Sequence, residues 1–161
     1  MAPPLHDALA PLAGLLGTFS GHGRGDYPTI EAFGYEETVT FGHVGKPFLA
    51  YAQRTAHPET GAPMHAETGY LRHVGDGHLE LLLAHPTGIV EVEQGRIETA
   101  ADVVALELET TTVGLTGTAK DVRALRRRFI LDGDELRYDL WMAHADTPMT
   151  HHLAARLRRT A

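Results

Sequence analysis

Histidine is the residue type in this sequence best suited to carry chemistry, and His151 and His152 stand side by side near its end. The chain has 161 residues, of which 11 are histidines, and imidazole is the commonest metal ligand. The surrounding residues alternate as in a β-strand, where neighbouring side chains point to opposite faces. At most one of the two can therefore enter a cavity, so zinc chelation by the pair is disfavoured. A lone neutral imidazole in an apolar cavity suits the axial position of a haem iron. A histidine with satisfied hydrogen bonds and no ligand fits the same pattern.

The alternation also indicates which of the two histidines faces inward. Leu153 and Leu157 share an apolar face with His151, whereas Arg156 shares the other face with His152. Parity alone therefore predicts that His151 points into the protein. A β-bulge, which adds one residue to a strand, would reverse this assignment.

Two further histidines stand at positions that could line a pocket. His85 ends a strand-like segment, 78–85, whose other residues on the same face are leucines. Met64 and His65 precede another such segment, 66–74, and could line a pocket mouth. Packing and barrel-rim positions are the alternative interpretations for all three residues.

A glycine-rich segment, 17–30, places Gly21, Gly23 and Gly25 on one face of a strand. Glycine weakens a strand unless a backbone or a flat group comes close to it. The spacing therefore indicates either such a close approach or a bent first barrel strand. A phosphate loop is excluded, because no Gly-Lys-Ser/Thr ending and no helix follow.

The elements that must position these residues are almost all strands. Apolar spacings of three and four predict one short amphipathic helix over 5–16, interrupted by Pro11. Ten strand-like segments follow, separated by Gly-, Asp- and Pro-rich turns: 17–23, 30–43, 48–55, 66–74, 78–85, 88–97, 103–113, 122–131, 135–144 and 150–158. The segment 30–43 is long enough to hold two strands or a bend. So many strands in one domain, residues 1–161, predict a closed barrel or a sandwich.

Composition excludes several classes of function. The net charge of −7 disfavours general binding to nucleic acid or to anionic lipid. The arginine-rich run Arg123–Arg128 is interpreted as a solvated strand face.

The sequence has no cysteine, which excludes disulfides, thiolate metal sites and a cysteine nucleophile. It also has no Gly-x-Ser-x-Gly elbow and no His-Glu-x-x-His motif. With no apolar run that could span a bilayer and no basic N-terminal start, a cytoplasmic location is expected.

Several strings, taken together in their order and spacing, resemble the nitrobindin family of ferric-haem β-barrels. They are Leu16-Gly-Thr-Phe-Ser-Gly-His-Gly, Tyr27-Pro-Thr-Ile-Glu, Tyr35-Glu-Glu, His43-Val-Gly-Lys-Pro, Pro63-Met-His-Ala-Glu-Thr-Gly-Tyr-Leu-Arg, Pro86-Thr-Gly-Ile-Val-Glu-Val-Glu-Gln-Gly and Pro148-Met-Thr-His-His-Leu. They span most of the chain. One departure is Phe19, which stands where the family's Gly-x-Trp-x-Gly-x-Gly motif has tryptophan, so local packing changes are expected.

The resemblance implies a single all-β fold, an antiparallel barrel of about ten strands with a short N-terminal helix and a b-type haem at one end. The family's proximal haem ligand, and hence the catalytic and iron-binding residue, corresponds to His152. This conflicts with the parity argument for His151. The remaining positions that the resemblance assigns to the haem pocket are Thr29, Met64, His65, His85 and Met142.

The activity implied by the resemblance is binding of nitric oxide and isomerisation of peroxynitrite to nitrate at the ferric haem. Three alternatives stay open at this point. They are a haem or nitric oxide carrier or sensor without turnover, a lipocalin-like carrier of an apolar small molecule, and a zinc site formed by His65, His85 and His152. The expected partners are small molecules, and a homodimer is left open.

Overall fold

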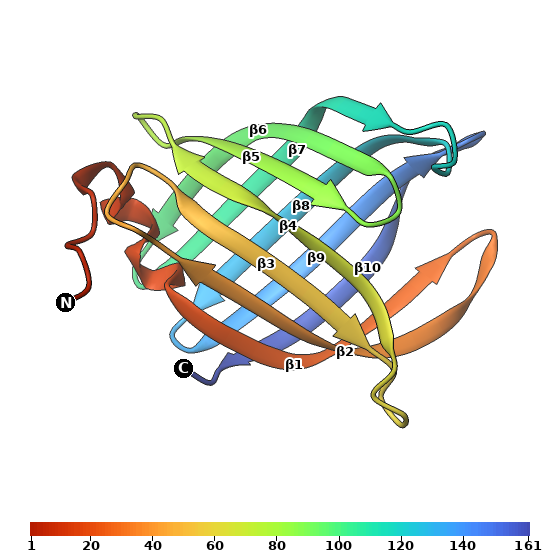
Figure 1. Cartoon of the computed structure of the whole chain (residues 1–161), viewed down its shortest axis with the longest axis horizontal. Helices are drawn as coiled ribbons and strands as arrows, with labels where there is room; N and C mark the ends of the chain where they lie inside the picture. Colours follow the sequence, from red (N-terminus) through yellow and green to blue (C-terminus); the bar gives the residue numbers. More distant parts are fainter.

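The computed structural model describes residues 1–161 and contains ten antiparallel strands that close into a barrel (Figure 1). The strand order around the barrel is β1-β10-β9-β8-β7-β6-β5-β4-β3-β2. Their bounds are β1 Gly17–Tyr27, β2 Ile30–Gly42, β3 Leu49–Ala56, β4 Pro63–His73, β5 His78–His85, β6 Ile89–Ala100, β7 Val103–Leu115, β8 Val122–Asp132, β9 Glu135–His144 and β10 Thr147–Arg159. The expected all-β barrel is thus confirmed, and the sandwich is excluded.

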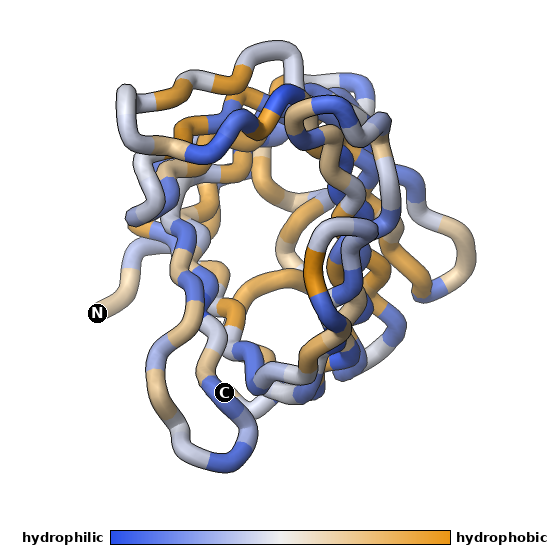
Figure 2. The backbone as a smooth tube through the Cα atoms, turned by 90° about the vertical axis from the view of Figure 1, so that its right-hand side faces the viewer, coloured by the Kyte–Doolittle hydropathy of each residue, from blue (hydrophilic) through white to orange (hydrophobic).

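Alternating side chains create the core of the barrel. In β3, burial alternates along Leu49–Ala56, and the buried residues include Leu49 and Tyr51. Hydrophilic and hydrophobic residues alternate in the same way along much of the tube in Figure 2. Since β1 pairs with β10, the sheet has no free edge, which removes the exposed hydrogen-bonding groups of an open sheet.

A 3₁₀ helix, η1 (Asp7–Leu15), closes one end of the barrel. Its residues Leu9, Leu12 and Leu15 are almost fully buried. Of the apolar positions on which the predicted helix rests, Leu12 and Leu15 face the core, whereas Leu5, Ala8 and Leu16 are only partly buried. The helix is 3₁₀ rather than α, and it contains Pro11, which lacks the backbone N–H of a regular helix interior. No helix in the structure is long and apolar enough to cross a membrane.

The predicted strands match the observed ones in number and order, but several ends differ. The segment 30–43 forms one strand, β2, rather than two. Strands β1 and β10 extend further toward the open end than predicted, to Tyr27 and from Thr147. These extensions lie at the end of the barrel opposite η1 (Figure 1). Most of the predicted pocket residues line a cavity there.

Candidate functional site

A cavity of about 320 Å³ opens into the end of the barrel opposite η1. Its volume lies at the lower end of the range for small-molecule sites. Ten of its 18 lining residues are hydrophobic, so most of the wall is apolar. The lining residues are Phe33, Tyr35, Gln53, Thr55, Met64, His65, Glu67, His85, Thr87, Ile89, Val122, Leu125, Arg127, Tyr138, Leu140, Met142, His152 and Leu153.

His152 is the histidine of the adjacent pair that reaches this cavity. Its Nδ1 lies 3.0 Å from the backbone oxygen of Asp26. A carbonyl oxygen only accepts, so Nδ1 carries the proton and Nε2 keeps a free lone pair. Tyr27 packs edge-on against the imidazole, with ring centroids 5.1 Å apart. Burial lowers the pKa of His152 despite the opposing hydrogen bond to Asp26, so the ring is neutral at pH 7.

A bulge in β10 explains why simple alternation along the strand predicted the wrong inward-facing histidine. His151 pairs with Trp141 and Leu153 pairs with Leu140, so His152 is an extra residue between two successive pairs. The prediction that His151 points inward is therefore wrong. His151 is exposed on the outer surface, where Nε2 lies 2.8 Å from Oδ1 of Asp139 and the ring packs against Trp141.

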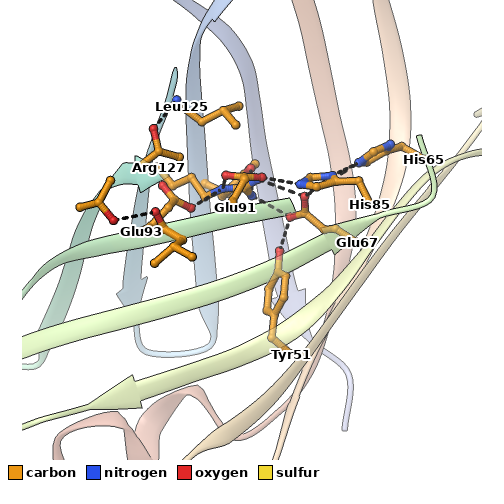
Figure 3. Close-up of polar contacts among 12 residues, drawn as sticks. Tyr51, His65, Glu67, His85, Glu91, Glu93, Leu125 and Arg127 are labelled. Atoms are coloured by element: carbon orange, nitrogen blue, oxygen red, sulfur yellow. Dashed lines mark hydrogen bonds and ion pairs between the residues drawn. The ribbon is translucent and has the colours of Figure 1, made fainter. Parts of the chain in front are cut away.

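His65 and His85 lie on the wall across from His152. His85 is on β5, which is five strands away from β10 in either direction around the ten-stranded barrel. His65, on the neighbouring β4, places Nε2 3.1 Å from Nδ1 of His85 (Figure 3). The other ring nitrogen of His85, Nε2, contacts a carboxylate oxygen of Glu91. The sequence therefore identified two histidines that do meet at the cavity.

Beneath the histidines lies a buried ionic network centred on Arg127. Its guanidinium binds both oxygens of Glu67, at 2.7 and 3.1 Å. It also contacts Glu91 at 2.7 Å and Glu93 at 2.9 Å (Figure 3). The hydroxyl of Tyr138 lies 2.8 Å from the guanidinium. Bidentate pairing and multiple donors compensate for the loss of water around these charges.

The interpretation of Arg123–Arg128 as a solvated face is wrong for one of its arginines. Arg123, Arg126 and Arg128 are exposed, but Arg127 is 0% exposed. It shares the inner face of β8 with Leu125 and Phe129.

The network holds neighbouring carboxyl groups in different protonation states. Burial acts to raise the pKa of Glu67, but the charge of Arg127 and hydrogen bonds outweigh it and hold that pKa well below its usual range. Burial acts to raise the pKa of Glu91 as well, yet Arg127 and His85 again bring it down. The pKa of Glu93 lies well above its usual range. Burial raises it by more than the charge of Arg127 lowers it, and the charge of Glu91 raises it further. Of the three carboxyl groups around Arg127, two therefore have lowered pKa values and one has a raised pKa.

The same chain matches a known family over nearly its whole length. The family model described as the THAP4-like, heme-binding beta-barrel domain matches residues 8–159. The chain belongs to this family. This finding confirms the family resemblance inferred from the sequence.

Relatives and a solved structure agree with this membership. Peroxynitrite isomerase 2 of Mycobacterium marinum is 55% identical over 99% of both chains. The peroxynitrite isomerase of Nocardia farcinica is 52% identical over 96% of this chain and 92% of its own. The crystal structure of Rv2717c from M. tuberculosis has a TM-score of 0.96 and 50% identity, and covers 98% of this chain and 100% of that one.

The residues of this THAP4-like barrel fit the haem that the family description names. An axial ligand must offer a neutral imidazole nitrogen, and the free Nε2 of His152 does so from a cavity wall that is mostly apolar. The hydrogen bond from Nδ1 to Asp26 fixes the tautomer and the ring orientation, as second-shell partners of metal-bound histidines commonly do. Donor type, burial and lining are thus all compatible with a haem iron on His152.

The other predicted haem-pocket residues divide into two groups. Met64, His65, His85 and Met142 line the cavity together with His152. Thr29 does not line it. It lies exposed in the turn between β1 and β2, two residues after Tyr27.

Sequence reasoning missed the buried charged residues in and behind the cavity wall, Glu67, Glu91, Glu93 and Arg127. One available signal was the parity of β8, because Arg127 alternates with Leu125 and Phe129. The partners of Arg127 could not be read in the same way, since Glu67 is 60 residues away in the chain and Glu91 is 36 away.

Proposed function

We propose that this protein binds a b-type haem through Nε2 of His152 and isomerises peroxynitrite to nitrate, and that it also binds nitric oxide. The observation that carries the proposal is the state of His152, a neutral imidazole with Nδ1 tied to Asp26 and Nε2 free at the cavity. Family membership and relatives that are named peroxynitrite isomerases support it. In this proposal, residues 1–161 act as one haem-binding unit.

The proposed reaction makes few demands on protein side chains. Peroxynitrite and nitrate have the same atoms and the same charge, so an O–O bond breaks and an N–O bond forms with no net redox change and no proton uptake. When bound, ferric haem supplies a Lewis-acidic and redox-active centre for this rearrangement. The chain therefore needs no general acid with a specially tuned pKa.

The contribution of the chain is to hold and enclose the reacting centre. The backbone of Asp26 and the ring of Tyr27 fix His152. Apolar residues such as Leu140, Leu153 and Met142 limit the access of water. On the opposite wall, His65 and His85 place their imidazole rings beside the cavity, paired with each other.

Stopped-flow kinetics of peroxynitrite decay test this function. The haem-loaded protein should accelerate decay in proportion to its concentration and shift the product toward nitrate, whereas the haem-free protein should do neither. An absorption band that shifts with nitric oxide, without accelerated decay, would instead favour a haem or nitric oxide carrier or sensor. A protein that takes up no haem but binds a fluorescent fatty acid would be a carrier of apolar molecules.

A further inference from the structure

His65, Glu67 and His85 bring three potential metal ligands to one point of the cavity wall. The distance from His65 Nε2 to His85 Nδ1 is 3.1 Å, and from His85 Nδ1 to Glu67 Oε2 it is 3.5 Å. The third side of the triangle, from His65 Nε2 to Glu67 Oε2, is 3.9 Å. Ligands bound tetrahedrally to one zinc ion at about 2.0 Å are about 3.3 Å apart, so the triangle is close to that of a metal site.

We propose that His65 Nε2, His85 Nδ1 and a carboxylate oxygen of Glu67 form a binding site for a divalent first-row transition metal, separate from the haem ligand His152. Two imidazoles and one carboxylate are the ligand set of catalytic zinc sites and of non-haem Fe²⁺ sites. The zinc alternative from the sequence had two of these ligands and placed His152 where the structure places Glu67.

Neighbouring side chains orient two of these ligands, His85 and Glu67. His85 Nε2 contacts Glu91, so this nitrogen can keep its proton while Nδ1, which faces His65 Nε2, offers its lone pair to a metal. Glu67 is fixed by Arg127 and by the hydroxyl of Tyr51, 2.8 Å from Oε1. Carboxylate–histidine–metal arrangements of this type are common second shells of metal sites.

The site has both an entry path and open coordination positions. The side chains of His85 and Glu67 are only 8% and 4% exposed, whereas that of His65 is 36% exposed. All three residues line the cavity. A metal held by them would therefore present its remaining positions to the cavity, where water or a small anion can bind.

Titration calorimetry with Zn²⁺ on the full-length, haem-loaded protein tests the proposal. We expect one zinc ion per chain. His65→Ala should weaken binding by more than about 100-fold, since even second-shell changes weaken metal sites 10- to 100-fold. Glu91→Gln should weaken binding within that second-shell range. Circular dichroism of each variant verifies that it is folded.

Two control variants separate this site from surface histidines and from the haem site. His78→Ala removes an exposed histidine at the other end of β5 and should leave zinc affinity unchanged. His152→Ala should lose haem but keep the zinc site. An affinity that is unaffected by His65→Ala, or one that falls equally with His78→Ala, would mean an adventitious surface ion only. Loss of zinc binding in His152→Ala alone would overturn the ligand assignment.

Discussion

The chemistry of this barrel depends on how single residues are protonated and paired inside it. One backbone oxygen orients His152 and burial keeps it neutral, while Arg127, Glu67 and Glu91 carry buried charge. Glu37 is a further carboxyl group in the interior. It is 2% exposed, and neither carboxyl oxygen has a hydrogen-bond partner within the protein.

Replacement of Glu37 by glutamine should change how stability depends on pH. Burial, reinforced by the charge of Glu67, raises the pKa of Glu37 from 4.5 to about 8. The folded state thus holds this proton while the unfolded state loses it, and the resulting stability, fully present below pH 4.5, is lost as pH rises through 8. The loss amounts to at most about 1.4 kcal/mol per pH unit.

Urea unfolding of the wild-type protein and of Glu37→Gln at both ends of this pH window measures the effect. The variant should gain stability relative to the wild-type protein as pH rises. A difference between the two proteins that is independent of pH would show that Glu37 is ionised in the folded state.

Replacement of Arg127 by leucine should be among the most destabilising single changes. It leaves the ionised Glu67 and Glu91 buried without their cation, which typically costs about 3–5 kcal/mol. The matched control is Arg128→Leu on the exposed face of the same strand. Its free energy of unfolding should change by no more than about 0.5 kcal/mol. Denaturant midpoints measure both, and similar values for the two variants would contradict a buried charge network.

At the scale of elements, irregularities in two strands shape the pocket. The bulge in β10 turns His152 inward. In β1, the alternate glycines make room for groups from neighbouring strands. A Cβ at Gly23 would overlap the ring of Tyr35, and one at Gly25 would overlap the ring of Phe33, while Gly21 lies against the backbone of Arg156. The close approach expected for these glycines is therefore to aromatic side chains and backbone.

Replacement of Gly23 by alanine should displace the ring of Tyr35, which is almost fully buried and lines the cavity. Overpacking of this kind lowers the free energy of unfolding by about 1–3 kcal/mol. Gly42→Ala in β2 is the control, because a Cβ there meets nothing within 4 Å. Thermal unfolding should show a lower midpoint for Gly23→Ala only, and equal midpoints would mean that the Tyr35 ring moves without strain.

The sequence was most informative where one periodic pattern decided the structure. Segments 78–85 and 135–144 were predicted with their observed bounds, because alternation and flanking turns agree there. Alternation failed at His151, since a bulge shifts the pattern by one residue and leaves no periodic signal. The alternation of side chains along 122–131 would have placed Arg127 inside, but its neighbouring arginines suggested a solvated face. Family resemblance, rather than parity, placed His152 correctly in the cavity.

At the scale of the whole molecule, the two ends of the barrel have different roles. Helix η1 fills one end with leucines, and the cavity occupies the other. The ionic network around Arg127 lies between them and ties β4, β6 and β8 together. This arrangement leaves a mostly apolar pocket with His152 on one wall and His65 and His85 on the other.

Haemin titration of the wild-type protein, His152→Ala and His151→Ala, followed by the Soret absorption band, tests the central claim most directly. The account predicts a saturable Soret band for the wild-type protein and for His151→Ala, because His151 lies on the outer surface. It predicts that His152→Ala folds but loses stable haem binding. An unchanged Soret band in His152→Ala, or its loss in His151→Ala, would contradict the assignment of His152 as the haem ligand.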